Sequence, residues 1–408
     1  MKNAWQTKTL GDVVAVQSGA GFPDRYQGQA DREIPFYKVS DMNIAGNERE
    51  MIHENNSITE EVRRELGAFL FPKGSTIFPK IGGAIATNKK RLTTRDCCVD
   101  NNVMGVIPKP GKIDSDFLFY FFLARDLSEF ANEAHLPSIK KTVVEAWPIP
   151  VPLLSEQQRI VGLLDEAFAG LATAQANAEK NLQNARALFE SHLQSVFTQR
   201  GPGWVETTIG EVCDIKHGFA FDGADFSNDV PDGNPLVITP GNFTEDGKLL
   251  FNERNTKRLS GKTLTGFQFD VGDLVVVMTD LSSKMKILGK PAFVETDDVL
   301  HNQRIGRVIF SSDRVEKRLL YYFMMTEGFL KNIKMSATGT MVRHTAPKRI
   351  LSNVIPFPES RKEQRAIISK LDDLREETQR LARLYERKLA ALEALKKSLL
   401  HQAFTGNL

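Results

Sequence analysis

The sequence has few cysteines, no long hydrophobic run and almost no net charge, and each deficit excludes a class of protein. Three cysteines, two of them adjacent, cannot form a disulfide framework, and no Cys or His pairs occur at zinc-ligand spacing. The longest apolar run, residues 117–124, is much shorter than the roughly 18 residues that span a membrane. The N-terminal residues lack the apolar core of a secretion signal. We therefore expect a cytoplasmic protein that makes no membrane contact and holds no structural metal.

The charge balance does not point to a polyanionic partner. With 53 Lys and Arg residues against 51 Asp and Glu residues, the formal net charge is +2. A nucleic-acid function must therefore depend on local groups of basic residues. A length of 408 residues with 41% apolar residues is enough for two or three domains with ordinary hydrophobic cores.

The most informative feature is an internal duplication with a period of about 200 residues. The stretch EQQRIVGLLDEA at 156–167 returns as EQRAIISKLDDL at 363–374, and residues 5–22 match residues 204–221. Further matches pair residues 71–77 with 269–275, 101–107 with 302–308, 116–123 with 317–324, 149–157 with 355–364, and 191–198 with 398–405. Each copy therefore consists of a globular part followed by a long helix.

The globular parts have the pattern of a mixed α/β fold. Short β-branched runs such as 13–16 and 274–278, interrupted by Gly and Pro, predict strands. Ser57, three residues before a glutamate, has the spacing of a capping box and predicts a helix start. A second helix is expected after Asp114 or Ser115, either of which can cap its N-terminus.

Two stretches, residues 155–198 and 362–405, contain no proline and are rich in Ala, Leu, Glu, Gln, Lys and Arg, which predicts two long helices. Residues recur there in steps of four and three, which is the spacing of a coiled-coil seam. The seam positions are Ile160, Leu164, Ala167, Leu171, Ala174 and Ala178 in the first helix and Ile367, Leu371, Leu374, Thr378, Leu381 and Tyr385 in the second. The alternative is that each helix packs only on its own domain. Against it, each helix would be roughly 66 Å long, which exceeds the width of a domain of this size.

Two copies of a domain and a helix can fold with pseudo-twofold symmetry if the helices are antiparallel. Because FTGNL ends the chain where FTQRGPGW leads into the second copy, the C-terminus should lie near the start of the first domain, in a nearly circular organisation. The predicted fold class is α+β, with two mixed α/β domains joined by two long helices that form an antiparallel coiled coil. The predicted boundaries are 1–154 and 201–360 for the domains and 155–200 and 361–408 for the helical spacer regions.

No catalytic arrangement is evident. Gly19 and Gly21 follow a strand, as in a nucleotide or S-adenosylmethionine loop, but the second copy has one glycine there and Pro23 interrupts any following helix. Lys262 follows a glycine but lacks the preceding glycine and strand of a phosphate-binding loop. The histidines are scattered. The sequence therefore predicts a binding protein without a cofactor or metal of its own.

Basic residues gather in the same region of both copies. Residues 66–95 hold six basic residues and no acidic one, and residues 281–294 hold three lysines and no acid. Lys and Arg neutralise phosphates, while Arg, Asn and Gln read base edges. The alternative is a solvated charged surface. The candidate DNA-binding residues are Lys80, Lys89, Lys90, Arg91, Arg95, Lys284, Lys286, Lys290, Asn302, Gln303, Arg304, Arg343, Lys348 and Arg349, with Asn101, Asn102, Lys140 and Lys141 as weaker counterparts in the first copy.

The repeated order of a diverged domain, IPVPLLSEQQRIVGLLDEA and a long helix closely resembles the specificity subunit of type I restriction-modification systems. The resemblance covers essentially the whole chain. It implies that the two domains are target recognition domains, each reading one half of a split DNA sequence. It also implies that the helical regions space these domains and dock other subunits.

The resemblance implies particular partners. These are double-stranded DNA, two modification subunits that methylate adenine, and ATP-dependent restriction subunits. S-adenosylmethionine, ATP and magnesium would belong to those partner subunits, so this subunit is expected to be non-catalytic. The residues alone leave two other classes open, namely a methyltransferase with a degenerate S-adenosylmethionine site and a coiled-coil adaptor that binds no DNA.

Overall fold

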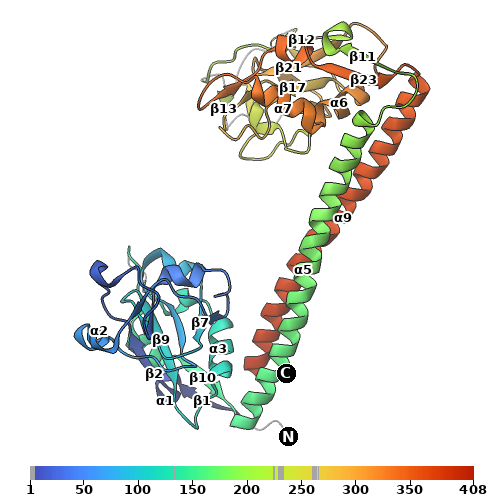
Figure 1. Cartoon of the computed structure of the whole chain (residues 1–408). Helices are drawn as coiled ribbons and strands as arrows, with labels where there is room; N and C mark the ends of the chain where they lie inside the picture. The colour runs from blue at the N-terminus through green and yellow to red at the C-terminus, as the bar shows by residue number, and fades with distance from the viewer. Residues whose placement is uncertain (1–4, 133–134, 224–225, 228–233, 260–263, 265) are drawn as a thin grey trace. The chain divides into compact units, whose positions relative to one another are not determined.

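The computed structural model describes residues 5–132, 135–223, 226–227, 234–259, 264 and 266–408. It divides into two compact units, which we treat separately. Unit 1 contains Met1–Glu179 and Glu386–Leu408, and unit 2 contains Lys180–Tyr385. Each unit holds one globular domain and a portion of each of the two longest helices (Figure 1).

Unit 1 is built on three sheets. The five-stranded sheet has the order β2-β9-β6-β7-β4, formed by Val14–Ser18, Val103–Pro108, Thr76–Pro79, Arg91–Thr93 and Glu50–Met51. The three-stranded sheet has the order β5-β3-β8, formed by Ser57–Ile58, Ile34–Tyr37 and Cys98–Val99. The strand β1 (Gln6–Thr9) pairs with β10 (Pro148–Val151). The short helices are α1 (Leu10–Val13), α2 (Glu60–Glu65), α3 (Ser115–Leu123) and α4 (Lys141–Ala146), with 3₁₀ helices at Asp24–Tyr26, Val39–Asn43, Gly82–Thr87 and Leu127–Phe130.

Unit 2 repeats this arrangement. Its four-stranded sheet has the order β12-β21-β17-β19, formed by Cys213–His217, Ile305–Phe310, Leu274–Val277 and Pro291–Phe293. Its five-stranded sheet has the order β13-β15-β14-β20-β16, formed by Phe226–Ser227, Arg258–Leu259, Leu236–Ile238, Val299–His301 and Gln268–Phe269. Two pairs complete it, β11 (Trp204–Thr208) with β23 (Val354–Pro358) and β18 (Thr279–Asp280) with β22 (Arg343–His344). The helices are α6 (Lys317–Met325), α7 (Glu327–Met335) and α8 (Pro347–Leu351), with 3₁₀ helices at Ile209–Glu211 and Pro240–Asn242.

The two domains are copies of one topology. The order β12-β21-β17-β19 corresponds to β2-β9-β6-β7, and all these neighbours are antiparallel in both units. The second sheet contains one parallel pair in each unit, β3 with β8 and β14 with β20. The predicted internal repeat and mixed α/β character are therefore confirmed.

The helix α3 forms the centre of the unit 1 core. Its residues 117–122 are all buried, so the helix is apolar on every side, as expected for an element covered by neighbours all round. Phe122 stacks on Phe78 of β6 at a ring separation of 5.2 Å, while Phe117 contacts Phe404 of the second long helix at 5.1 Å. Asp114 caps the helix, as predicted, by accepting hydrogen bonds from two backbone amides.

One predicted helix start is wrong. Ser57 lies in the strand β5, and the helix α2 begins three residues later with Thr59 as its N-cap. The Thr59 hydroxyl accepts a hydrogen bond from the Val62 amide at 3.3 Å. Both residues can cap a helix, and pairing of Ser57 with Pro35 in the sheet decides between them.

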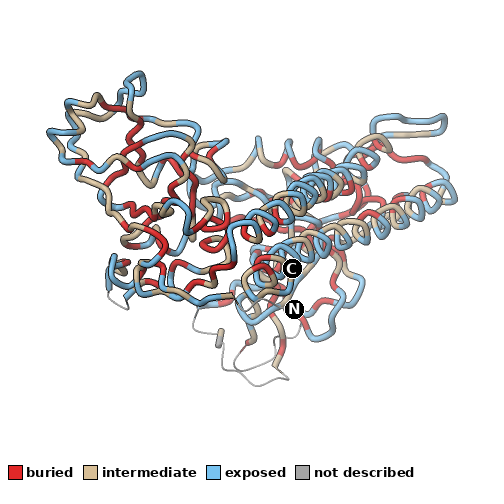
Figure 2. Tube along the Cα trace, turned by 90° about the horizontal axis from the view of Figure 1, so that it is seen from below, coloured by how far each residue is buried: buried red, intermediate tan, exposed pale blue. Residues whose placement is uncertain are grey.

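The two long helices are α5 (Leu154–Thr198) and α9 (Arg361–Thr405). Every predicted seam position is buried or intermediate, whereas much of the remaining helix surface is exposed (Figure 2). In unit 1 the α5 residue Ile160 shares a core with the α9 residue Leu400, and in unit 2 Leu193 shares a core with Leu371. The start of each helix thus lies beside the end of the other, which makes the pair antiparallel. No helix in the described part of the chain is both long and apolar enough to cross a membrane.

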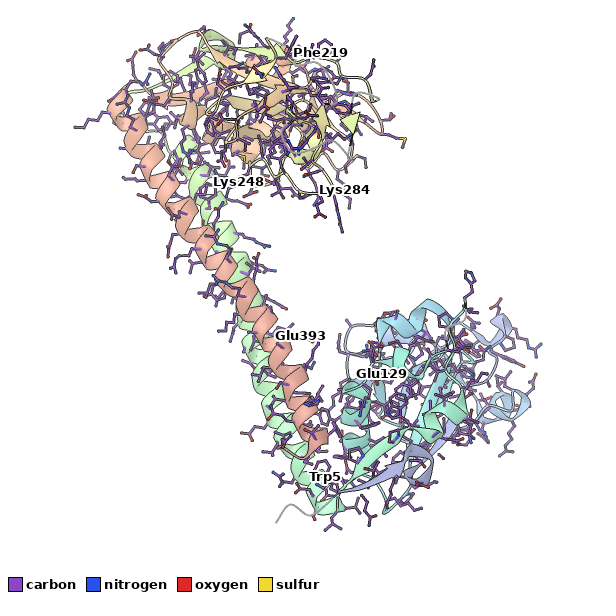
Figure 3. The ribbon with its side chains drawn as sticks, turned by 180° about the vertical axis from the view of Figure 1, so that it is seen from behind. Trp5, Glu129, Phe219, Lys248, Lys284 and Glu393 are labelled. Carbon is purple, nitrogen blue, oxygen red and sulfur yellow. The ribbon has the colours of Figure 1, made fainter. Side chains whose placement is uncertain are left out.

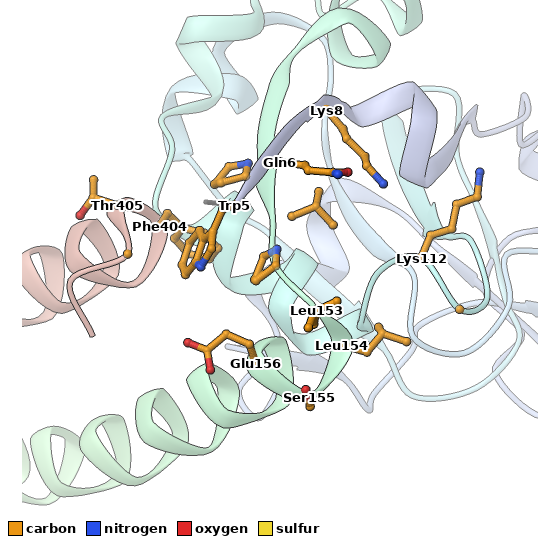
Figure 4. A pocket seen from close by; sticks show the side chains of 15 residues that line it. Trp5, Gln6, Lys8, Lys112, Leu153, Leu154, Ser155, Glu156, Phe404 and Thr405 are labelled. Carbon is orange, nitrogen blue, oxygen red and sulfur yellow. The ribbon is translucent and has the colours of Figure 1, made fainter. Parts of the chain in front are cut away.

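The end of the chain lies beside its first described residues. Trp5 and Phe404 line one pocket of unit 1, together with Leu153, Leu154 and Glu156 from the start of α5 (Figure 4). Arg159 also donates a hydrogen bond to the backbone carbonyl of Leu408 at 2.9 Å. This arrangement is the nearly circular organisation that the sequence predicts.

In unit 1 the repeated sequence motif attaches α5 to α3. The amide of Gln157 is fully buried, accepts a hydrogen bond from the Asp114 backbone at 2.7 Å and donates one to the Pro152 carbonyl at 2.9 Å. About two turns further along, Asp165 accepts a hydrogen bond from the Tyr120 hydroxyl. The motif therefore secures the helix to the domain that precedes it.

Unit 2 makes the same contacts with the second copy of the motif. Gln364 is fully buried, accepts from the Glu316 backbone at 2.8 Å and donates to the Pro358 carbonyl at 2.9 Å. Asp372 accepts a hydrogen bond from the Tyr322 hydroxyl. The motif is repeated because two helices must be attached to two domains in the same way.

Candidate nucleic-acid interface

A glycine sets the close approach of two strands in each domain. A Cβ atom on Gly19 would clash with the carbonyl oxygen of Asp100, and one on Gly218 would clash with the carbonyl oxygen of His301. Only glycine fits at these positions. The segment after Gly19 leads to the 3₁₀ helix Asp24–Tyr26 instead of the α-helix that a nucleotide-binding loop requires. The packing of two strands is therefore sufficient to explain this glycine.

Beside this glycine, three segments of unit 1 meet. The Lys80 amide donates to the Asn102 carbonyl at 2.8 Å, and the Ile139 amide donates to the Lys80 carbonyl at 2.9 Å. Ile81 and Ser138 form an antiparallel bridge next to these bonds. The end of β6, the turn before β9 and the segment before α4 are thereby held together.

The same three segments meet in unit 2. The Met278 amide donates to the Arg304 carbonyl at 2.9 Å, and the Thr345 amide donates to the Met278 carbonyl at 2.9 Å. Thr279 and His344 pair in the antiparallel ladder of β18 and β22. The backbone frame is thus the same in both units.

We call this frame the turn junction. It lies where β6 ends in the five-stranded sheet of unit 1 and where β17 ends in the four-stranded sheet of unit 2. It consists of residues 79–82, 100–103 and 137–139 in unit 1 and of residues 277–280, 302–305 and 343–345 in unit 2. The hydrogen bonds of the junction show that the sequence match pairs the wrong residues of the two copies in this turn. Asp100 accepts from the Asn102 amide at 3.0 Å and Asn302 from the Arg304 amide at 3.0 Å, so Asn302 corresponds to Asp100 and not to Asn101.

Four predicted site residues lie in the unit 2 junction. Asn302 is buried and holds the turn, whereas Arg304 is exposed. Gln303 is partly buried, and its Oε1 atom has no hydrogen-bond partner among the described residues. Arg343 pairs with Asp280 in the ladder and has a buried Nε atom that likewise lacks a described partner. Buried polar atoms of this kind are costly unless water or a ligand satisfies them.

The loop of residues 281–287 starts and ends at this junction. The Asp280 carboxylate accepts hydrogen bonds from the amides of Ser282 at 2.8 Å and Ile287 at 3.0 Å, which closes the loop. Lys284 is exposed and projects from the edge of unit 2 (Figure 3). The structure therefore brings Lys284 and the junction residues to one end of the sheet.

The other unit 2 candidates have different surroundings. Lys286 is exposed and pairs with Glu245 at 2.6 Å, and this hydrogen bond raises the pKa of Lys286. Lys290 is partly buried, and burial lowers its pKa. Lys348 is exposed and Arg349 is partly buried on α8, outside the junction. Lys286 therefore lies in the loop beside the junction with its charge paired, whereas Lys348 and Arg349 lie on a separate helix.

In unit 1, Lys80 belongs to the turn junction and donates to the Ser18 hydroxyl at 3.1 Å. Lys89 is partly buried and lies where the connection from β6 reaches β7. Because β6 and β7 are antiparallel, this point is at the same end of the sheet as Lys80. Arg95 is exposed but follows the opposite end of β7, where it pairs with Glu54. Of these three residues, Lys80 and Lys89 lie at the junction end of the sheet.

Two predicted DNA contacts are buried. Lys90 is 1% exposed and donates to the Arg125 carbonyl at 2.7 Å, next to the C-terminus of α3, and burial lowers its pKa to about 8. Arg91 is buried in β7 and donates to the Met42 carbonyl at 2.8 Å. Both side chains are therefore directed at carbonyl groups of the protein, which distinguishes them from the exposed candidates.

Sequence reasoning missed a group of exposed apolar side chains beside the junctions. These are Leu136 in unit 1 and Leu281, Met341 and Val342 in unit 2. Isolated apolar residues in loops have no periodic pattern, so no sequence signal marks them. Over the described ranges, no group of three His, Cys, Asp or Glu residues is placed to hold a metal ion.

Comparison with known proteins identifies a family. The profile of the type I restriction modification DNA specificity domain matches residues 2–181 and 202–387. The type I restriction enzyme MjaVIII specificity subunit of Methanocaldococcus jannaschii is 25% identical over 329 residues, which are 76% of this chain and 74% of that protein.

Two solved structures share the fold at 18% sequence identity. The HsdS subunit from Thermoanaerobacter tengcongensis aligns with a TM-score of 0.61 over 100% of this chain and 98% of that chain. A chain from a study of complex assembly and conformational transition of the type I R-M system aligns with a TM-score of 0.75 over 100% of this chain and 99% of that chain.

Proposed function

The chain belongs to the family of type I restriction-modification specificity subunits, and from this premise we propose that it recognises a split, asymmetric site in duplex DNA. Residues 1–154 read one half-site and residues 201–360 read the other. The helical regions 155–200 and 361–408 hold the domains apart and dock two modification subunits.

The observation that carries this proposal is a repeated backbone frame with different exposed side chains. Asn102 occupies in unit 1 the position of Arg304 in unit 2, and both are exposed at the end of the same turn. An amide and a guanidinium present different hydrogen-bond patterns to base edges. Two domains that differ in this way read different sequences, so the combined site is asymmetric.

Exposed cations supply the sequence-independent part of binding. Arg304 and Lys284 are exposed in unit 2, Lys80 is partly exposed in unit 1, and all three lie at or beside the turn junctions. Each phosphate neutralised by such a group releases counterions, so affinity falls as the salt concentration rises. The buried residues Lys90 and Arg91 are not part of the proposed interface.

The chemical steps belong to the partners in this proposal. Modification subunits methylate adenine with S-adenosylmethionine, and restriction subunits use ATP and magnesium for translocation and cleavage. The specificity subunit selects the DNA site at which they act.

The test lengthens the two helices together. One heptad inserted near Asn177 and one near Leu384 keeps the coiled-coil seam and adds about 10 Å to each helix. Since ten base pairs of duplex span roughly 34 Å, the preferred gap between half-sites should grow by up to about three base pairs. Methylated adenines are then mapped in cells that carry the modification subunit and either version of the chain.

Two results of lengthening the helices would agree with the proposal. Three extra base pairs also rotate the second half-site by about 100°, so the result is either a longer spacer or loss of modification. Methylation of the original site at full efficiency would show that the helices do not set the distance between half-sites.

A further inference from the structure

An exposed apolar side chain occurs at the same position beside both turn junctions. Leu136 is 63% exposed and lies two residues before the partner of Ile81 in the unit 1 bridge. Val342 is 36% exposed and lies two residues before the partner of Thr279 in the unit 2 ladder. Single exposed apolar residues are ordinary, but recurrence at equivalent points of two diverged segments indicates a shared role.

In unit 2 this side chain belongs to a small apolar spot. The antiparallel ladder ends at the pair of Asp280 with Arg343, so Leu281, which follows Asp280, and Val342, which precedes Arg343, both adjoin the end of the ladder. Leu281 is 61% exposed, and Met341, which precedes Val342, is 80% exposed. The tip of the ladder is therefore apolar and open to solvent.

Two exposed cations lie at the same end of the sheet as this tip. Arg304 belongs to the junction, and Lys284 belongs to the loop of residues 281–287 that Asp280 closes. The carboxylate of the ladder, Asp280, is only 3% exposed and accepts backbone hydrogen bonds that close the loop. Apolar side chains flanked by exposed positive charge complement a DNA groove, where phosphates flank the base edges.

In unit 1 the apolar side chain is held in place. A Cβ atom built on Gly82 would lie 3.2 Å from Leu136 Cδ1, so Leu136 packs over this glycine. The Gly82 amide donates to the Pro137 carbonyl at 2.7 Å, which fixes the backbone next to Leu136. Asn101 and Asn102 are exposed in the same junction and can hydrogen-bond base edges.

We infer that Leu136 in unit 1 and Met341 and Val342 in unit 2 are specificity-determining residues that contact thymine methyl groups, each unit in its own half-site. The C5-methyl group of thymine is the apolar group that bases present in the major groove. This inference rests on the proposed function, because it assumes that each junction reads bases.

The test removes the methyl group from the DNA and the side chain from the protein. Deoxyuridine replaces each thymine of the mapped site in turn, and the affinity of the full chain assembled with its modification subunits is measured. One replacement in the unit 1 half-site should weaken wild-type binding by about fourfold, as expected for one buried methyl group. Leu136→Ala should weaken binding to thymine DNA. The affinity of this variant should not change further when deoxyuridine replaces that same thymine. Met341→Ala/Val342→Ala should behave in the same way towards the other half-site.

Matched controls lie at the opposite end of each sheet. Ile52, which is 51% exposed, follows β4 at the end remote from the unit 1 junction, because β4 is parallel to β7 and β7 is antiparallel to β6. Val271, which is 56% exposed, lies before the start of β17, whose end forms the unit 2 junction. Ile52→Ala and Val271→Ala should keep wild-type affinity and the wild-type response to deoxyuridine. All variants are compared by circular dichroism melting to establish that they fold.

The outcomes separate the inference from the proposed function. If the wild-type complex shows no salt-dependent, sequence-dependent binding, both are overturned. If it binds with sequence preference but the junction variants respond to deoxyuridine as the wild type does, only the methyl contact is overturned. Loss of assembly with the modification subunits in the junction variants, with unchanged DNA affinity, would instead assign the apolar spots to a protein partner and overturn the inference.

Discussion

Gln157 in unit 1 and Gln364 in unit 2 are fully buried and make the same kind of contact, whereas Asn102 and Arg304 hold equivalent exposed positions with different chemistry. A buried amide that loses its partners leaves unsatisfied groups, so its identity is constrained. An exposed side chain at the end of a turn has no such constraint. The comparison shows where the copies are free to differ, and this is where a reading function can diverge.

A second difference shows that a charge contact can persist while its residues move. In unit 1, Arg49 pairs with Asp165 at 3.0 Å and with Asp116 at 2.8 Å. In unit 2, Arg318 pairs with Asp372 at 2.7 Å. Arg318 follows its helix N-cap by two residues, as Asp116 does, so unit 2 has an arginine at the helix position where unit 1 has a carboxylate. The aspartate of the repeated motif, Asp165 or Asp372, pairs with an arginine in both units.

The largest effect is expected from the buried amides. Gln364→Ala removes three hydrogen bonds, to the Glu316 amide and to the carbonyls of Arg314 and Pro358, and should lower the free energy of unfolding by about 3 kcal/mol. Gln157→Ala removes two and should cost about 2 kcal/mol. Urea unfolding measures both.

The control for the buried amides is Gln175→Ala, an exposed change on α5 that should alter stability by less than about 0.5 kcal/mol. Equal stability of Gln364→Ala and Gln175→Ala would mean that the buried contact does not secure α9.

The next effect concerns a buried charge and depends on pH. The pKa of Lys90 is lowered to about 8, whereas an unfolded lysine has a pKa of about 10.4. Between these two pH values the unfolded chain binds more protons than the folded chain, so the contribution of Lys90 to the free energy of unfolding becomes more favourable as the pH rises. This contribution is least favourable below pH 8. The stability advantage of Lys90→Met over the wild type should therefore be about 2 kcal/mol greater at pH 7 than at pH 10.

The control for the buried lysine is the neighbouring change Lys89→Met, which leaves Lys90 in place. The pH dependence that Lys90 causes should persist in this variant. A constant difference between Lys90→Met and the wild type from pH 7 to pH 10 would contradict the burial of a charged group.

The smallest effect is expected from the ion pairs of Arg49 with Asp116 and Asp165. Arg49→Met should cost about 0.5–1 kcal/mol, since the paired side chains are about two-fifths exposed and solvent screens them. Arg49→Met/Asp116→Arg copies the unit 2 arrangement and should regain part of this loss. A double-mutant cycle by urea unfolding measures the recovery. If the double variant is less stable than Arg49→Met, the two arrangements are not interchangeable.

Over part of the repeat, the sequence match and the structure differ by one residue in how they pair the two copies. Residues 116–123 and 317–324 are both mostly apolar, so hydrophobicity alone matches them at more than one offset. The N-caps decide the offset, because Gln157 binds the Asp114 amide and Gln364 binds the Glu316 amide. Tyr120 therefore corresponds to Tyr322, and both bind the aspartate of the repeated motif.

The duplication, the two long helices and their seam followed from the sequence, because a repeat and a helical period are visible in the order of residues alone. The sequence narrowed the N-cap of α3 to Asp114 or Ser115, and the structure shows Asp114. The basic residues show what such patterns omit. Lys89, Lys90 and Arg91 are neighbours of one charge type, yet Lys90 and Arg91 are buried and Lys89 is only partly so. Exposure is decided by what the rest of the chain places over a side chain, here the carbonyl groups of Arg125 and Met42. Only the tertiary structure could therefore separate cations that are free to meet a phosphate from those that hold the domain together.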